Sequence, residues 1–205
     1  ERFRYGDYHY YLEAATALSN GQPLPDTYLY LPLWATLLQF IVSLGDQGVM
    51  IVLWTVNIFA LGLFYFLLIR ILERYGFSKY LSIVIAVLFL LINTPLMRTL
   101  GFIQVNLLTM DLILLGMLTY PKNTFLSALT LALAVHLKTS PAVLVLAFLL
   151  EFNWRWMFWF AVSFLVIGLF PIAINGVDVY YQYVNNAFLL TQLPDTNFHD
   201  TSFDS

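Results

Sequence analysis

The sequence predicts an all-α fold, a polytopic bundle of transmembrane helices. Of its 205 residues, 60% are hydrophobic and only 10% are charged, whereas about 25% of a soluble domain is usually charged. Several apolar runs reach the length of about 20 residues that a helix needs to cross a bilayer. Cysteine is absent, which excludes disulfides and thiol chemistry. The net charge of −3 does not suggest nucleic-acid binding.

Residues 1–48 are predicted to form an outer loop that carries short helices along the membrane surface. Asp7 is of the residue type that caps a helix N-terminus, and Asn20-Gly21 is a typical C-terminal stop, so we expect a helix between them. Along one side of this helix we expect Asp7, Tyr10, Tyr11 and Ala14. The later apolar segment 31–44 is shorter than a membrane span and is expected to lie on the membrane surface.

A transmembrane core is predicted over residues 49–174, followed by an outer polar tail over residues 175–205 that begins a further loop. The core has spans at about 49–72, 80–96, 99–120 and 156–174, with a broken hairpin at 124–150. Because the sequence opens on a polar segment without Met, we expect it to be a piece of a longer protein with an upstream helix.

The hairpin is predicted because the residues around Lys138 interrupt an apolar stretch. Residues 124–137 would form a helix of roughly 21 Å at about 1.5 Å per residue, and the arm from Pro141 is shorter still. Neither arm spans a hydrocarbon core of about 30 Å. Irregular backbone at membrane depth is tolerated only against protein or a wet cavity, so we expect Lys138 near the tip of the hairpin, facing such a cavity.

The distribution of basic residues predicts the orientation of the chain. Lys and Arg are enriched in short cytoplasmic loops, and here those loops would hold Arg70, Arg74, Lys79, Lys122 and Arg155. This topology places Asp7, Arg98, the 136–138 turn and the tail together on the outer face.

The outer-facing residues combine one carboxylate with cations and aromatic rings. A carboxylate such as Asp7 can remove the proton of a hydroxyl group. Lys138 and Arg98 can neutralise a phosphate, an effect that a low dielectric strengthens. Tyrosines suit sugar rings, and an apolar groove suits a lipid tail. Together these features favour transfer of a group from a lipid-phosphate donor.

Each of these residues also has a structural interpretation. Asp7 can act as a cap only, and the two roles are compatible. Lys138 can extend to the interface, Arg98 can be an ordinary loop cation, and His136 can be a packing residue. Polar residues of the predicted third span, Gln104 and Asp111, can hydrogen-bond between helices. The sequence has no metal cluster, nucleophile motif or glycine-rich phosphate loop, and we expect no cofactor.

Several short motifs occur in the order seen in a known family. They read Gly6-Asp7-Tyr8…Ala15…Gly21, Tyr30-Leu31-Pro32-Leu33, Gln104-Val105-Asn106 and Leu137-Lys138-Thr139-Ser140-Pro141. In this order the chain resembles about the first half of glycosyltransferase family 87, the bacterial polyprenyl-phosphate-mannose-dependent mannosyltransferases of the GT-C superfamily. The family often has Gly where this chain has Ile103, a Pro where it has Thr139, and Tyr-Pro-Pro at residues 30–32. The identity of the sugar therefore stays open.

The resemblance implies a glycosyltransferase of the bacterial plasma membrane and cell envelope whose active site faces outward. Its donor would be a polyprenyl-phosphate sugar, with mannose as one option, and its acceptor a hydroxyl of a glycolipid, glycan or protein. The family's outer-loop aspartate is its catalytic base, a role that carries over to Asp7 and goes with inversion. We expect donor phosphate contacts from Lys138, Arg98 and His136, and substrate contacts from Tyr8, Tyr11, Gln104 and Asn106.

Two other functions remain open from the sequence. A transporter or channel subunit would use Asp111 and Lys138 in an ion path, and a non-catalytic scaffold would use its polar residues only to pack helices. One outer-facing cavity shared by Asp7 and Lys138 would favour the enzyme. A polar path through both leaflets, lined by Asp111, would favour transport.

Overall fold

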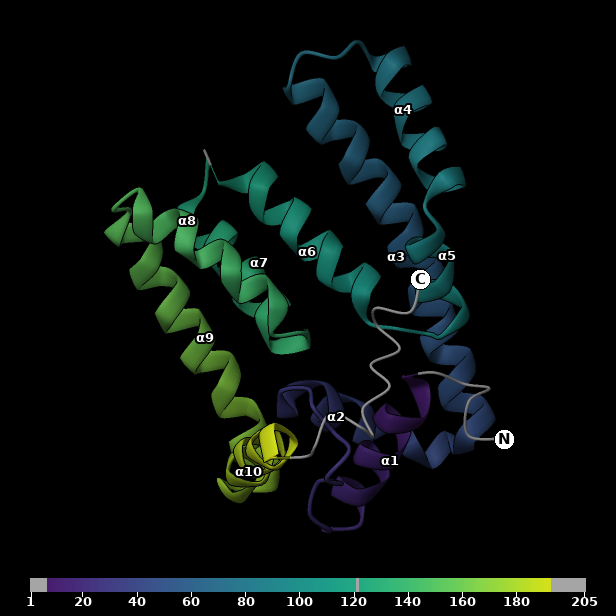
Figure 1. Cartoon of the computed structure of the whole chain (residues 1–205), viewed down its shortest axis with the longest axis vertical. Helices are drawn as coiled ribbons and strands as arrows, with labels where there is room; N and C mark the ends of the chain where they lie inside the picture. The colour runs from purple at the N-terminus through teal and green to yellow at the C-terminus, as the bar shows by residue number, and fades with distance from the viewer. Residues whose placement is uncertain (1–6, 121, 193–205) are drawn as a thin grey trace.

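The protein is all-helical, as the sequence predicts. The computed structural model describes residues 7–120 and 122–192, and within these ranges every regular element is a helix. A long hairpin, α3 and α4, lies beside a group formed by α6, α7 and α9, and α3 packs against α6 (Figure 1). The helices α1, α2 and α10 gather at the lower end in this view, beneath both parts. The predicted features at residues 1–6, at 121 and in the tail 193–205 lie outside the described residues.

The N-terminal segment folds into two short helices. Helix α1 (Tyr8–Ser19) ends at the predicted stop, where Gly21 adopts a positive φ of 67° that suits glycine. Helix α2 (Pro32–Leu38) begins with proline, whose missing N–H is not needed at that position, and continues as the 3₁₀ helix η2 (Gln39–Leu44). The prediction that Tyr10 lies on the same side of α1 as Tyr11 and Ala14 is wrong. Tyr10 is 46% exposed, whereas Tyr11 and Ala14 are fully buried.

Helix α3 (Gly45–Arg74) has 30 residues and begins four residues before the predicted span. Gly45, at φ +73°, turns the chain, and the helix starts at once instead of after a break over residues 45–48. A turn containing Gly76, at φ +92°, then leads to α4 (Lys79–Ile92), whose first turn is capped by the Ser78 hydroxyl.

The predicted spans 80–96 and 99–120 are wrong at the border between them. Helix α4 ends at Ile92, and α5 (Thr94–Gly101) leaves it at a bend of 63°. The Asn93 side chain caps α5 by accepting the Leu96 N–H, and Pro95 supplies no N–H to continue α4. The chain then unwinds before α6 (Asn106–Thr119), which is only 14 residues long.

The remaining helices form a layer beside α6. Helix α7 (Thr124–Leu137) packs on α6 and α9, and after a break at Lys138 the chain returns as η3 (Ser140–Leu144) and α8 (Val145–Leu150). Helix α9 (Trp154–Asn175) then runs down to α10 (Asp178–Gln192). The indole of Trp156 stacks on Phe148 with centroids 3.7 Å apart and fixes α8 against α9.

Two continuous helical stretches are long and apolar enough to cross a membrane, Pro32–Arg74 and Trp154–Asn175. The bent pair α4–α5 could be a third span, whereas α6, α7 and η3–α8 are apolar but short. Helix α9 exposes large apolar side chains, among them Leu165, Val166 and Leu169. Such a surface is suited to contact with lipid.

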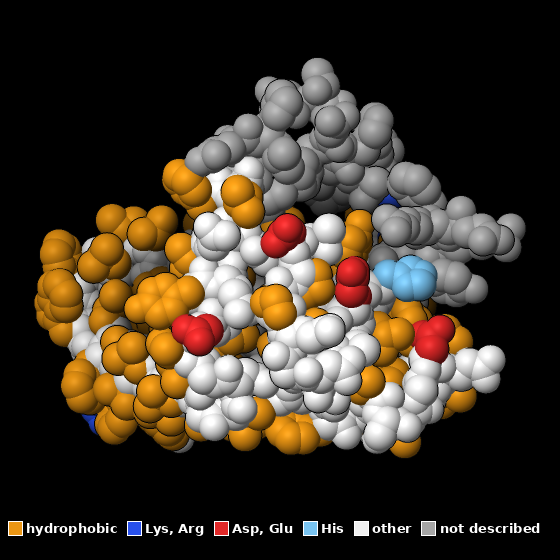
Figure 2. Space-filling view, turned by 90° about the horizontal axis from the view of Figure 1, so that it is seen from below, with side chains coloured by type: hydrophobic (Ala, Val, Ile, Leu, Met, Phe, Trp, Pro, Cys, Tyr) orange, Lys and Arg blue, Asp and Glu red, His pale blue; other side chains and the backbone are white. Residues whose placement is uncertain are grey.

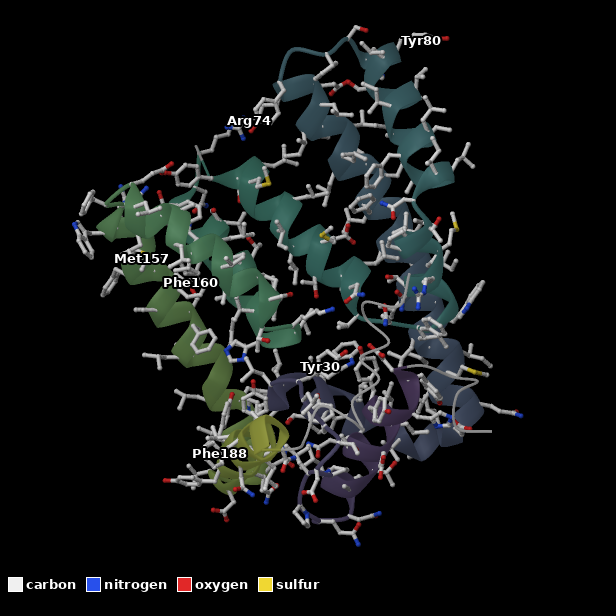
Figure 3. All side chains as sticks on the ribbon, in the orientation of Figure 1. Tyr30, Arg74, Tyr80, Met157, Phe160 and Phe188 are labelled. Carbon is white, nitrogen blue, oxygen red and sulfur yellow. The ribbon has the colours of Figure 1, made fainter. Side chains whose placement is uncertain are left out.

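Charged residues divide between the two ends of the molecule. Among the coloured residues of Figure 2, the end seen there shows several acidic side chains and little Lys or Arg. Exposed acidic residues at this end are Glu13, Asp26, Asp46 and Asp178. The opposite end, where α3 and α4 meet, carries Arg74, labelled in Figure 3. Arg70 and Lys79 belong to the same end of the α3–α4 hairpin.

Candidate active site

Asp7 lies at the centre of a cluster of hydrogen bonds that joins three parts of the chain. All three bonds end on its Oδ2: the Tyr30 hydroxyl donates over 2.8 Å, the Gln104 amide over 3.1 Å and the Tyr11 hydroxyl over 3.4 Å. Asp7 occupies the N-cap position of α1, but its side chain accepts no backbone N–H. The predicted capping role is therefore wrong, because the carboxylate accepts hydrogen bonds from side chains and not from the backbone of the first turn of α1.

The two tyrosines that bond to Asp7 are held rigidly. Tyr11 is fully buried, and its ring meets Tyr30 edge to face at 5.1 Å and Trp34 at 6.1 Å. Burial, and then the neighbouring negative groups, raise the pKa of Tyr11 and of Tyr30 well above the usual value. Both hydroxyls thus stay protonated and donate to Asp7. Figure 3 shows Tyr30 above α2, toward the end of α7.

Tyr8, which we expected to contact substrate, instead joins two helices. It is 1% exposed, and its hydroxyl donates to the carboxylate and to the backbone carbonyl of Asp46 in the first turn of α3. This contact fixes α1 against α3. Neither Tyr8 nor Tyr11 presents a ring face to solvent, so their proposed substrate contacts have no support from these positions.

Gln104 and Asn106 extend the polar cluster away from Asp7. The Gln104 Oε1 accepts from the Asn106 Nδ2 over 2.7 Å, and the Asn106 Oδ1 accepts from the Lys138 Nζ over 2.8 Å. An unbroken line of hydrogen bonds thus runs from Lys138 to Asp7. We call these four residues the polar chain: Asp7, Gln104, Asn106 and Lys138.

The backbone that carries Gln104 has an unusual conformation. Ile103 adopts a positive φ of 52°, which β-branched residues rarely do. Ile103 and Val105 are buried in the core that also contains Tyr11, and they anchor the turn from both sides of Gln104. The turn is closed by the Gln104 N–H, which donates to the Thr99 carbonyl over 3.0 Å.

Lys138 lines a mainly apolar cavity of about 440 Å³. It is half-buried and lies in the break between α7 and η3. The polar residues of the lining are Lys138, Asn93, Thr99, Asn106, Thr109 and Ser140, and the apolar lining includes Phe64, Phe89, Met110 and Val143. Asp7 and Asp111 are not among the lining residues. The cavity lined by Lys138 therefore does not include Asp7, and the polar chain is what connects the two residues.

The other residues expected at a phosphate site lie elsewhere. The Arg98 guanidinium stacks over the Phe102 ring at 5.8 Å and is not part of the cavity lining. His136 is fully buried; its Nε2 donates to the Phe164 carbonyl over 2.9 Å, and its ring stacks on Phe164 at 4.4 Å. These contacts match the packing interpretation of His136, so its phosphate role stays a prediction without structural support.

Asp111, the key residue of the transporter alternative, is 3% exposed within α6. Neither of its carboxylate oxygens has a hydrogen-bond partner. Over residues 7–120 and 122–192, no three His, Cys, Asp or Glu residues are grouped closely enough to hold a metal ion.

Helices that can span a membrane, together with a polar chain beside an apolar cavity, define the class: an all-helical membrane protein with an internal site. The chain matches glycosyltransferase family 87 over residues 28–202 and therefore belongs to that family. It is a membrane glycosyltransferase. Tyr30, Gln104, Asn106 and Lys138 lie within the matched region, and Asp7 lies before it. Neither the curated proteins nor the solved structures contain a match.

Proposed function

We propose that this protein transfers a sugar from a polyprenyl-phosphate donor to an acceptor hydroxyl, with Asp7 as general base. The observation that carries the proposal is the polar chain, which connects a carboxylate to a lysine in the lining of an apolar cavity. A base and a cation held at a fixed separation are the two groups that this reaction needs.

The cavity supports a lipid-linked donor. Its lining is mainly apolar, and Lys138 lines it together with Asn106 and Thr99, to which it is linked by hydrogen bonds, so a prenyl chain and its phosphate would each meet a matching surface. An ammonium group is a strong partner for phosphate, and its effect grows where water is excluded. Arg98, one helix away on α5, is a second candidate cation for the same phosphate.

The polar chain suggests how the bonds would rearrange. The hydrogen bonds described for the Asp7 carboxylate end on Oδ2, which makes Oδ1 the oxygen to take the acceptor proton. The acceptor oxygen would attack the anomeric carbon on the face opposite the phosphate, so that configuration inverts. The bond from carbon to phosphate oxygen breaks, and its electron pair leaves with the polyprenyl phosphate, whose charge Lys138 would balance.

We place the reaction on the outer face of a bacterial plasma membrane. The end of the molecule that holds α1 is acidic, and the far end of the α3–α4 hairpin carries Arg70, Arg74 and Lys79. Basic loops favour the cytoplasmic side. Mannose is the first sugar to test, and the acceptor is a glycolipid, glycan or protein hydroxyl.

Purified protein in nanodiscs, supplied with a panel of polyprenyl-phosphate sugars and acceptors, tests the proposal. We expect one donor to be consumed, with release of polyprenyl phosphate and a product of inverted anomeric configuration by NMR. A product of retained configuration would refute the single-displacement mechanism. Use of nucleotide sugars in place of every lipid-linked donor would refute the donor class.

A further inference from the structure

We propose that Gln104 and Asn106 are positioning residues that couple the general base to the phosphate-binding lysine. They were expected to contact substrate, but both amides are engaged by protein groups on both sides. The proposal rests on the proposed function of Asp7 and Lys138 and adds to it that these two groups act as one unit.

The hydrogen bonds of the polar chain have one possible direction. Lys138 can only donate, so the Asn106 atom that faces it must be Oδ1, and Nδ2 then points to Gln104. The Gln104 Oε1 accepts from that Nδ2, which leaves Nε2 to donate to the Asp7 carboxylate. The cation at one end and the anion at the other thus orient both amide dipoles the same way. Hydrogen bonds aligned in this manner strengthen one another.

The surroundings hold the two amides in this orientation. The Thr99 hydroxyl donates to the Gln104 Oε1 over 3.3 Å and lies 3.4 Å from the Asn106 Nδ2 as acceptor. Val105, between the two polar residues, is 1% exposed and anchors them to the core. Gln104 and Asn106 thus occupy fixed positions before any substrate arrives, as preorganised catalysis requires.

Lys138 can keep its place in the polar chain while it binds a phosphate. An ammonium group has three donors, and Asn106 takes one of them. The remaining donors face a cavity whose lining includes Asn106, Thr99 and Ser140. The hydrogen bond from Lys138 to Asn106 therefore orients the ammonium group, and the hydrogen bond from Gln104 orients the Asp7 carboxylate. Within residues 7–120 and 122–192, the titratable groups in contact with Asp7 are Tyr11 from its own helix and Tyr30 from the segment before α2.

Two single variants separate the roles of the two amides. Gln104→Leu removes a donor to the Asp7 carboxylate, which favours its protonated form, so kcat should fall about 10–100-fold, the loss typical of a hydrogen bond to a charged group. The acidic limb of the pH–rate profile should move to higher pH, while affinity for polyprenyl phosphate stays unchanged. Asn106→Leu should weaken polyprenyl phosphate binding about 10-fold or more. Thr119→Val, at the far end of α6 from this site, is the control for helix α6.

The decisive experiment is a double-mutant cycle between Gln104→Leu and Lys138→Met, because no direct bond joins these side chains among the contacts described. Coupling through Asn106 predicts that their effects on kcat/KM are non-additive, by about 3-fold or more. Additive effects, or an acidic limb that does not move in Gln104→Leu, would overturn the proposal. Asp7→Asn in the same assay tests separately whether Asp7 is the general base and whether it is coupled to Lys138. An inactive Asp7→Asn with additive effects refutes only the coupling, and an active Asp7→Asn refutes the base.

Discussion

Tyr30 donates a hydrogen bond of 2.8 Å to the Oδ2 of Asp7, from a segment 23 residues further along the chain. Burial raises the pKa of Tyr30 above its usual value of about 10. The Tyr30 hydroxyl therefore stays protonated at every pH below about 10 and continues to donate to Asp7. Tyr30→Phe keeps the ring packing but removes the donor.

We expect Tyr30→Phe to lower kcat about 10-fold or more, since hydrogen bonds to charged groups contribute about 1.5–3 kcal/mol. Its melting temperature should also fall, by up to about 3–12 °C at roughly 2–4 °C per kcal/mol for a chain of this size, so kcat is compared well below the unfolding transition. Steady-state kinetics and thermal unfolding in detergent measure the two effects. Tyr10→Phe, at an exposed position of α1, is the matched control, and equal kinetics for the two variants would contradict a role for Tyr30.

Lys138 is predicted to bind the donor phosphate. Lys138→Met keeps much of the side-chain length but removes the charge, so affinity for polyprenyl phosphate should fall about 10–100-fold. Lys138→Arg should restore part of the loss, because the charge returns with a different geometry. Binding titrations in nanodiscs measure this series. If Lys138→Met binds polyprenyl phosphate as well as the unmodified protein does, the lysine serves another purpose.

The apolar cavity is predicted to hold the prenyl chain. Val143 lines it from η3 and is 63% exposed, so Val143→Trp should narrow the cavity without disturbing the core. KM for a long-chain donor should rise several-fold, with a smaller change for a short-chain donor. Val166→Trp, on the exposed face of α9, is the control. Equal effects of Val143→Trp on both donor lengths would place the chain elsewhere.

Gly116 allows α6 and α7 to approach closely. A Cβ at this position would lie 3.0 Å from the Thr130 Oγ1 and 3.4 Å from the Ser127 carbonyl oxygen. Gly116→Ala should therefore destabilise the protein by about 1–3 kcal/mol, the usual cost of overpacking. Gly62→Ala, where a Cβ meets nothing within 4 Å, should be neutral or slightly stabilising. Reversible unfolding in detergent compares them, and the opposite order of stability would show that the α6–α7 contact is loose.

Much of the fold could be predicted from the sequence because its signals are local. Composition indicated membrane helices, Asn20-Gly21 marked the end of α1, and the polar residues around Lys138 marked the break after α7. The break between α5 and α6 was missed, because Gln104 and Asn106 were interpreted as polar residues within a continuous span. The positive φ of Ile103 could not be expected from the sequence, since a β-branched residue rarely adopts it.

The arrangement of the site was harder to predict because it depends on contacts between distant residues. Asp7 fits an N-cap by residue type. It does not cap α1 because its carboxylate is hydrogen-bonded to Tyr30 and to Gln104, which is 97 residues away. His136 likewise was predicted to contact phosphate, but in the fold its ring is hydrogen-bonded to the Phe164 carbonyl and stacked on the Phe164 ring. The link from Gln104 through Asn106 to Lys138 needed the fold, since Gln104 lies in the turn before α6, Asn106 begins α6, and Lys138 lies in the break after α7.

Turnover by Asp7→Asn tests the central claim most directly. This substitution keeps the shape of the side chain and removes the base, and loss of a general base typically costs about 10²–10⁴ in rate. The measurement is single-turnover sugar transfer from the donor identified in the panel, in nanodiscs, with binding of polyprenyl phosphate as the check on folding. We predict that Asp7→Asn binds polyprenyl phosphate normally and transfers sugar at least 100-fold more slowly. Transfer by a folded Asp7→Asn at close to the unmodified rate would contradict the assignment of Asp7 as the base.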